Sequence, residues 1–320
     1  MKQKSFINRV GNLLYQQKAL AFIGIILLIM AVAGPRFYSL YNFMEILKSA
    51  AVYEVLAFGV TLTIICGGCD LSVGHNMCLA GIIAIMLMSY LPIWLCVIIA
   101  VAAGALVGFV NGFLCVHQKT APFIVTLGMD MLLKGLCQFL SDAHPVPGSR
   151  PEFALFGNGK LFGVPYLAII AIALLIVFWI ILRLTPFGRN CYAIGGDYNV
   201  AVYSGIKAVP IMWLCFVISG MTAALGGVML SARFNSGSSI YGENTALIVN
   251  CGAVLGGTSF AGGVGGIPQT ALGLLLFTLL ENSMNILQIT AYTQLLMKGV
   301  IIALVLGIDY YAQKRKAEAV

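Results

Sequence analysis

Long apolar runs separated by short polar segments follow one another along most of the chain. A helix needs about 20 mainly apolar residues to cross the roughly 30 Å hydrocarbon core of a bilayer, and most of the runs approach that length. The pattern therefore predicts an all-α polytopic membrane protein with about ten transmembrane helices. The predicted spans cover residues 19–34, 50–66, 76–91, 93–116, 122–140, 164–182, 210–231, 244–257, 267–288 and 292–309.

The polar gaps between the runs leave no room for a large soluble domain. The two longest, 141–163 and 183–209, have the size of loops, so residues 1–320 are interpreted as a single transmembrane domain. The composition supports a membrane protein without a soluble domain. Of the residues, 60% are hydrophobic and only 9% are charged, against about 45–50% and 25% in soluble domains.

Membrane topology explains the net charge of +7, because cytoplasmic loops carry an excess of Lys and Arg. With the amino terminus inside, eleven of the eighteen basic residues are cytoplasmic and four lie on the opposite side, which places both termini in the cytoplasm. The eleven are Lys2, Lys4, Arg9, Lys18, Lys119, Arg183, Arg189, Lys207, Lys314, Arg315 and Lys316. The four are Arg36, Arg150, Lys160 and Arg233.

The basic start of the chain also resembles a signal peptide, because an apolar run and Ala31-Val32-Ala33 follow it. Further spans come after this run, so the sequence favours a retained first helix.

Glycine clusters interrupt two of the apolar runs, at 67–74 and 256–263. Broken helices at membrane depth are tolerated only beside other protein or a watery cavity, so we expect these segments to lie in one of these two settings and not against lipid. The dipeptide Lys134-Gly135 in the fifth span is echoed by Lys298-Gly299 in the tenth, as two five-span halves would produce. With an odd number of spans in each half, the repeat would be inverted.

Small residues recur at every fourth position in three of the predicted spans. Such faces pack helix on helix in membrane proteins. They are Gly104, Gly108 and Gly112, then Ser219, Ala223 and Gly227, then Gly299, Ala303 and Gly307.

Six ionisable residues fall inside or at the edges of the spans, where a charge costs about 2.5–3.5 kcal/mol at the bilayer centre. We expect them to face the bundle interior, a second subunit or a cavity. They are Glu54, Asp70, Asp130, Lys134, Glu281 and Lys298. The alternative is that the two lysines reach an interface and that Glu54 pairs with Lys48 or a neighbouring helix.

A capped helix is predicted within the polar segment 183–209. Asp197 is a good N-cap and Gly205 a good residue to end a helix, so the seven residues between them form a short helix. Val200, Ala201 and Tyr203 would cluster on one side of it, as a surface for a soluble partner. An interfacial helix lying on the membrane is the alternative.

The sequence contains no nucleotide-binding or metalloprotease motif. Neither G-x-x-x-x-G-K-[ST] nor H-E-x-x-H occurs, and the three histidines are dispersed, so no metal site is predicted. Cys66-Gly-Gly-Cys69 matches C-x-x-C, but no second pair lies at ligand spacing. Ser72 and His75 could form a hydrolytic dyad, which would make the chain an intramembrane enzyme.

A series of segments, in this order and spacing, resembles the permease subunits of bacterial ABC importers for monosaccharides, the ribose, galactose and allose permease family. The segments are Gly68-Cys-Asp70-Leu-Ser-Val-Gly74, Pro122-Phe-Ile-Val-Thr126-Leu-Gly128, Phe187-Gly-Arg189, Ala193-Ile-Gly-Gly196, Ser204-Gly205-Ile206, Gly256-Gly-Thr-Ser-Phe-Ala-Gly-Gly263 and Asn285-Ile-Leu287. The resemblance covers nearly the whole chain.

The resemblance implies a type II importer like the vitamin B12 permease, with ten helices per chain and two permease chains, identical or closely related. It also implies two cytoplasmic ATPases that bind ATP and Mg, a periplasmic sugar-binding protein and a location in the inner membrane. The permease itself would need no cofactor. The chain departs from the family pattern at Asp197, where Asn is usual, at His75, and at Glu281-Asn282, where a neutral pair is frequent.

Residues 183–209 would be the coupling loop that docks into the ATPase. The coupling residues are expected to be Gly188, Arg189, Gly196, Asp197, Ala201 and Gly205. Polar side chains would line the sugar's route by hydrogen bonding, and we expect these to be Asp70, Ser72, Asn111, Thr126, Asn282 and Asn285. The rival hypothesis is an ion-coupled secondary transporter that uses Glu54, Asp130 or Glu281.

Overall fold

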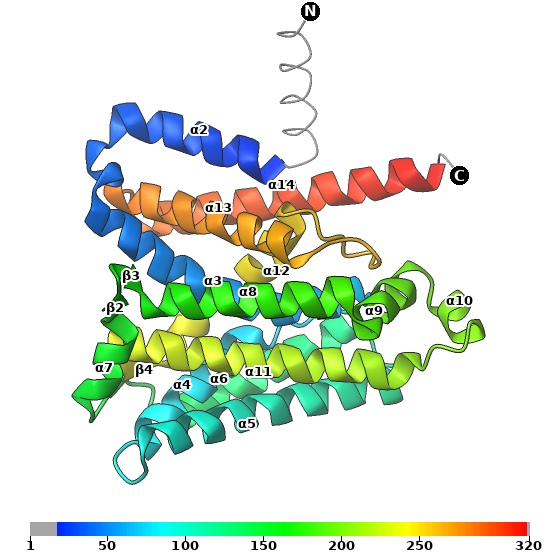
Figure 1. Ribbon diagram of the computed structural model, residues 1–320, viewed down its shortest axis with the longest axis horizontal. Coiled ribbons are helices and arrows are strands. Elements are labelled where there is room, and N and C mark those ends of the chain that lie inside the picture. The colour runs from blue at the N-terminus through cyan, green and yellow to red at the C-terminus, as the bar shows by residue number, and fades with distance from the viewer. Residues whose placement is uncertain (1–17, 319–320) are drawn as a thin grey trace, which may run out of the picture.

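The computed structural model describes residues 18–318, which form a bundle of helices that run mostly along one direction (Figure 1). Each of the ten predicted spans overlaps an α-helix, so the all-α fold is confirmed. These helices are α2 (Lys18–Ala33), α3 (Leu40–Ile65), α4 (Val73–Leu87), α5 (Ile93–Gly112), α6 (Pro122–Leu140), α8 (Tyr166–Leu184), α11 (Ala208–Phe234), α12 (Thr245–Leu255), α13 (Ile267–Ile286) and α14 (Ala291–Glu318).

Five helical segments within 18–318 are long and apolar enough to cross a membrane. They are α3, the stretch Ile93–His117 formed by α5 and the π-helical turn η2 (Phe113–His117), α6, α8 and α11. Large apolar side chains cover the outside of the bundle, for example Leu106 and Phe139. An apolar exterior of this kind suits lipid, so the protein is a multi-pass membrane protein.

The centre of the bundle is α11, which packs against α3, α4 and α5. Glycines allow these close approaches, and two of the predicted small-residue faces are confirmed as packing surfaces. A methyl group on Gly108 would lie 2.2 Å from the Phe216 carbonyl oxygen, and one on Gly227 would lie 2.0 Å from that of Met77. Helix backbones this close gain van der Waals contact that lipid cannot supply.

The third small-residue face differs from the other two. At Gly299 and Gly307 of α14, no described atom other than those of the neighbouring residues and the local helix backbone lies within 4 Å of where a β-carbon would stand. Within the described part of this chain these two positions pack on no other helix, so the prediction of helix packing here stays a prediction.

Both glycine clusters end a helix in the same way. Gly67 after α3 and Gly257 after α12 have left-handed φ angles of 82° and 112°, which glycine adopts without steric cost. In each case two amides fold back onto carbonyls of the last turn, as with the 2.8 Å bond from Gly68 N to Thr63 O. This Schellman pattern satisfies carbonyls that a broken helix would otherwise leave bare.

The two ends of the bundle carry different small elements (Figure 1). At one end lie α9 (Pro186–Gly196) and α10 (Tyr198–Tyr203), toward which the last turns of α14 also point. The opposite end carries α7 (Pro151–Asn158), the helical turns η1 (Pro35–Tyr38) and η3 (Ser239–Gly242), and two short strand pairs. Antiparallel β1 (Val146–Pro147) pairs with β4 (Ser236–Gly237), and β2 (Lys160–Leu161) pairs with β3 (Val164–Pro165).

The first predicted span, α2, packs onto α13. Met30 is buried in a cluster with Leu279, Phe37 and Ile46. Lys2, Lys4 and Arg9, on which the signal-peptide and topology arguments partly rest, lie outside the described residues.

Candidate functional site

A polar cavity of about 550 Å³ opens between α3, α11 and α13. α11 has 27 residues, or about 40 Å of helix, and the cavity lies near its carboxyl end, far from α10. The polar side chains that line it are Asn42, Glu45, Ser49, Tyr53, Arg233, Tyr241, Thr278, Glu281, Asn282 and Asn285. Such a concave site with convergent donors and acceptors suits a small hydrophilic solute.

An ion-pair network holds one wall of the cavity. Arg233 donates to Glu45 at 2.9 Å and to the hydroxyl of Ser49 at 2.8 Å, and Lys48 donates to the other carboxylate oxygen of Glu45 at 2.8 Å. Arg233 also lies over the ring of Phe234, 5.4 Å from its centroid. The network ties α3 to the end of α11, because Arg233 of α11 pairs with Glu45 of α3, and Lys48 one turn further along α3 shares the same carboxylate.

A reciprocal amide pair joins α3 to α13 at another side of the cavity. Asn42 donates to the side-chain oxygen of Asn282 at 2.9 Å, and Asn282 donates to that of Asn42 at 2.7 Å. Asn285 accepts a 2.9 Å hydrogen bond from Gln294. These amides can exchange protein partners for the hydroxyls of a solute, because each carries both donors and an acceptor.

A second cavity of about 340 Å³ adjoins the first, since both are lined by Tyr53, Tyr241 and Glu281. Lys298 of α14 lines it and donates to Glu281 at 2.8 Å. Glu281 and Lys298 thus face a cavity, one of the three settings expected for the ionisable residues of the spans.

The first glycine break is held by a buried hydrogen-bond network around Asp70, which is wholly inaccessible. One carboxylate oxygen of Asp70 accepts from the amide and hydroxyl of Ser72 at 3.0 and 2.7 Å, and the other accepts from Ser219 at 2.7 Å. Asn111 donates to Ser72 at 2.8 Å, and Asn250 of α12 donates to the Asp70 carbonyl at 3.0 Å. The carboxylate thus fixes the start of α4 and ties it to α11.

The structure therefore separates the six predicted pathway residues into two groups. Asn282 and Asn285 line the cavity. The other four are buried around the first glycine break, where Thr126 donates to the Cys69 carbonyl at 3.4 Å. They are Asp70, Ser72, Asn111 and Thr126.

Other intramembrane charges also find partners. Asp130 lies 2.8 Å from Nδ1 of His75, and Lys134 donates to Glu243 at 3.1 Å. Lys48 pairs with Glu45 and not with Glu54, so the alternative pairing of Glu54 with Lys48 is wrong. Among the side chains that the structure describes, Glu54 forms no ion pair.

The side chains of Ser72 and His75 make hydrogen bonds to different residues. The Ser72 hydroxyl bonds Asp70 and Asn111, whereas the imidazole of His75 bonds Asp130. A hydrolytic dyad needs the base within hydrogen-bond reach of the nucleophile, and no hydrogen bond joins these two side chains in the described part of the chain.

At the other end of the bundle, α10 is capped as the sequence predicts. The Asp197 side chain accepts from the amide of Val200 at 3.0 Å, which satisfies one free donor of the first turn. Gly205 has a left-handed φ of 85°, and the amide of Ile206 reaches the carbonyl of Ala201 at 3.1 Å. These bonds form a Schellman motif at the end of the helix.

The orientation of α10 differs from the sequence-based expectation. Val200 and Tyr203 are exposed, but Ala201 is only 3% exposed and packs with Ile194 and Ala208. The prediction that Val200, Ala201 and Tyr203 share one side is wrong, because Ala201 anchors α10 to α9 and α11. The outward face carries Tyr198, Val200, Val202 and Tyr203.

The remaining coupling residues are placed by α9, a helix that the sequence analysis did not predict. Thr185 caps it by accepting from the amide of Gly188 at 3.4 Å. A methyl group on Gly188 would lie 2.1 Å from the Leu182 carbonyl oxygen, so only glycine fits this turn between α8 and α9. Arg189 and Gly196 are exposed.

The inner face of α9 contacts both glycine breaks. A methyl group on Gly195 would lie 1.8 Å from the carbonyl oxygen of Ile65, at the end of α3, and 2.5 Å from the amide of Gly263. The Tyr192 hydroxyl donates to the carbonyl of Gly265 at 2.8 Å, and burial raises the pKa of Tyr192. The segment between α8 and α11 is thus packed directly against the two interruptions of the bundle.

Several residues of the site were missed by sequence reasoning. Glu45 and Arg233 lie near the ends of apolar runs, where a charge is ordinary, and Tyr53 and Tyr241 carry no motif. The sequence shows only that Glu45 precedes one span and that Arg233, of opposite charge, follows another. This does not show that the two spans are neighbours.

The chain is a helical membrane protein with an apolar exterior, a polar cavity of solute size near one end and a capped helix at the other. The family described as "Branched-chain amino acid transport system / permease component" matches residues 42–306, and the chain belongs to this family.

The curated relatives confirm the resemblance to ribose, galactose and allose permeases. The chain is 35% identical to the ribose import permease protein of Bacillus subtilis, with 92% of each chain covered. It is 33% identical to the galactose/methyl galactoside import permease protein of Haemophilus influenzae, over 94% of this chain and 97% of the relative. It is 32% identical to the D-allose transport system permease protein of Escherichia coli, over 91% and 90%. No solved structure matches the chain.

Proposed function

We propose that the chain is the transmembrane permease subunit of an ATP-binding cassette importer that passes a pentose or hexose across the bacterial inner membrane. The observation that carries the proposal is its similarity over more than nine-tenths of its length to ribose, galactose and allose permeases. The cavity supports it, because amides, carboxylates, an arginine and two tyrosines can hydrogen-bond a polyhydroxylated solute. The chain performs no chemistry on the sugar.

The energy source in this proposal is a separate cytoplasmic ATPase that binds ATP and Mg. Residues 183–209 are the coupling loop, and the exposed face of α10 enters the ATPase. The proposed coupling residues are Gly188, Arg189, Gly196, Asp197, Ala201 and Gly205, with Ala201 acting from inside as the anchor of α10. Both termini lie on the same, cytoplasmic side.

Coupling follows from the contacts of α9. Closure of the ATPases displaces α10, which is rigidly capped and packed on α9. α9 in turn presses on the ends of α3 and on the segment after α12 through Gly195 and Tyr192. Because both breaks lie between helices that line the cavity or adjoin it, their displacement rocks these helices and changes access to the cavity. Ten spans arranged as two inverted halves belong to this proposal, as does a second permease chain, identical or closely related.

Sugar enters this route from a periplasmic binding protein at the end of the bundle that carries α7 and the cavity. Asn282 and Asn285 contact the solute there. Asp70, Ser72, Asn111 and Thr126 act on the route by fixing the geometry of the first break.

Purification from its native membrane in mild detergent tests the proposal. We expect an ATP-binding cassette ATPase and a second permease chain to co-elute, and replacement of Val200 by Asp on the exposed face of α10 to remove the ATPase alone. A preparation in which the chain elutes without an ATPase, and in which Val200→Asp changes nothing, would contradict it.

A further inference from the structure

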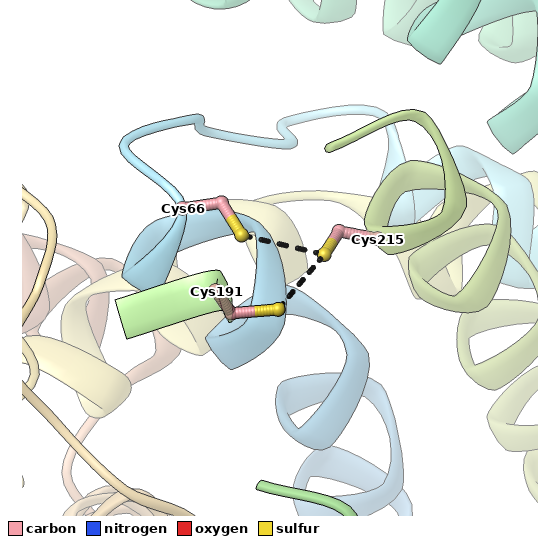
Figure 2. A group of neighbouring side chains, drawn as sticks. All are labelled: Cys66, Cys191 and Cys215. Carbon is pink, nitrogen blue, oxygen red and sulfur yellow. Dashed lines mark hydrogen bonds between the residues drawn. The ribbon is translucent and has the colours of Figure 1, made fainter. Parts of the chain in front are cut away.

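Three buried thiols from distant parts of the chain meet beside the coupling loop (Figure 2). Cys66 follows the last turn of α3, Cys191 lies on α9 and Cys215 on α11. The sulfur of Cys215 lies 3.5 Å from that of Cys66 and 3.8 Å from that of Cys191, and all three sulfurs lie within 4.8 Å of one another. We call this group the thiol triad.

The spacing of the thiol triad fits one central atom bonded to all three sulfurs. A thiophilic centre about 2.3 Å from each of three sulfurs holds them roughly 4 Å apart. The observed separations are close to this value, so the triad can close on a ligand with little movement of its helices. The C-x-x-C motif does not form this site, because Cys69 turns away and contacts Asn250 at 3.5 Å.

The surroundings of the thiol triad decide the chemical class of its ligand. The three cysteines share an apolar cluster with large buried side chains of α3, α8 and α13, including Phe58, Leu62, Phe178 and Ile267. A complex that kept a net charge in this apolar cluster would be unfavourable in free energy, because a buried charge needs a partner of opposite charge. Zinc prefers four ligands, and the triad offers three sulfurs.

Trivalent arsenic meets both conditions. Arsenous acid is neutral, and As(OH)₃ with three thiols gives As(SR)₃ and three waters. Three As–S bonds form, three As–O bonds break, and each hydroxyl leaves with a thiol proton, so no oxidant, reductant or counter-ion is needed. The product is neutral and three-coordinate.

A cavity lies close to the thiol triad on the side of α8. The cavity has a volume of about 290 Å³, lies between α8, α9 and the start of α13 and is lined by Leu182 and Ile267. Both residues also belong to the apolar cluster around the triad. Leu182 and Ile267 thus contact both the cavity and the cluster that holds the sulfurs, and movement of these apolar side chains would give a small neutral molecule access to the triad.

We propose that Cys66, Cys191 and Cys215 form a three-thiol binding site for a trivalent arsenic species, with arsenous acid as its simplest ligand. The bound atom would join α9 covalently to the end of α3 and to α11. Binding itself does not depend on the transport function. Its consequence does: if α9 transmits the motion of an ATPase, arsenic at the triad stops transport without displacing the ATPase.

The test uses the purified full-length chain, incubated with arsenite, freed of unbound ligand by gel filtration and analysed for arsenic per chain. We expect one arsenic to be retained by the parent chain and by Cys69→Ala, and none by Cys191→Ala, which keeps α9 apolar and close to its native volume. Cys66→Ala provides a second loss-of-binding variant should Cys191→Ala elute as aggregate. The same chain should retain no zinc.

Equal arsenic retention by the parent chain and by folded Cys191→Ala would overturn the site, as would the absence of retained arsenic in the parent chain. Sugar uptake is measured separately. Arsenic bound at the triad with uptake intact would contradict the role of α9 in coupling and leave the binding site standing.

Discussion

The amide of Gly263 donates a 2.9 Å hydrogen bond to the carbonyl of Ile65, so the segment after α12 is joined directly to the end of α3. Nearly two hundred residues of sequence separate these two positions. Gly195 of α9 lies against the same junction, with no room for a side chain. Three backbones therefore meet at one point on the side of the bundle from which the coupling loop projects.

Gly195→Ala tests whether the contact of α9 with Ile65 and Gly263 transmits movement of the coupling loop to the membrane-spanning helices. The added methyl group would stand 1.8 Å from the Ile65 oxygen, so α9 must shift, at a cost of about 1–3 kcal/mol. We expect uptake to fall strongly while the protein still inserts, as measured by sugar uptake against the amount of chain in the membrane. Gly135→Ala in α6 is the matched control, because no atom outside its own helix backbone and chain neighbours lies within 4 Å of that β-carbon position among the described residues. Equal uptake by the two variants would contradict a tight transmitting contact.

Gly205→Val addresses the cap of α10. Valine at a left-handed φ of 85° costs about 1–2 kcal/mol, so the end of α10 should unwind. The expected result is loss of sugar-stimulated ATPase activity with normal membrane insertion. Gly205→Asn should retain most of the activity, because Asn tolerates the left-handed conformation. Normal stimulation in Gly205→Val would show that the capped shape of α10 is not required.

The Glu45–Arg233 pair should stabilise the cavity wall. Removing one partner leaves the other charge partly buried without its ion pair, and we expect Arg233→Met to lower the free energy of unfolding by about 1.5–3 kcal/mol. Glu45→Gln should lower it by a similar amount. The double variant should lose less free energy of unfolding than the sum of the losses in the two single variants. Thermal or denaturant unfolding in detergent measures this coupling. Strict additivity of the two losses would show that the pair contributes nothing as a unit.

Asp70→Ala distinguishes a structural role at the first break from contact with the solute. The change leaves the amide and hydroxyl of Ser72 and the hydroxyl of Ser219 without their acceptor, at about 1–3 kcal/mol for each buried donor. We expect a lower unfolding temperature and reduced uptake of every transported sugar alike. Asp70→Asn keeps one acceptor oxygen and should lose less. A change in preference between sugars at unchanged stability would instead place Asp70 in contact with solute.

The helical architecture followed from the sequence because length and hydropathy decide which segments can cross lipid. Capping chemistry likewise placed α10 between Asp197 and Gly205, since both caps depend on local backbone geometry. Its rotation could not be predicted, because the burial of Ala201 depends on Ile194 and Ala208 of neighbouring helices. The same limit applies to the cavity: Glu45 and Arg233 are separated by 188 positions, and only the fold makes them partners.

The sequence identified Asp70 as an important polar residue but could not show whether it contacts the solute or stabilises the fold. A carboxylate in a glycine break indicates an important polar site, but a water-lined route and a sealed network contain the same residue types. The three donors found around Asp70 come from two segments, and Ser219 is as ordinary in sequence as any small residue of a packed helix.

Reconstitution into sealed vesicles tests the central claim most directly. Sugar uptake would be followed with the chain alone under an imposed proton or sodium gradient, and with a co-purified ATPase, binding protein and ATP. The account predicts accumulation against a concentration gradient only when ATP is hydrolysed, and none from an ion gradient. Uphill uptake by the isolated chain under an ion gradient, lost in Glu54→Gln, would contradict it and identify an ion-coupled transporter.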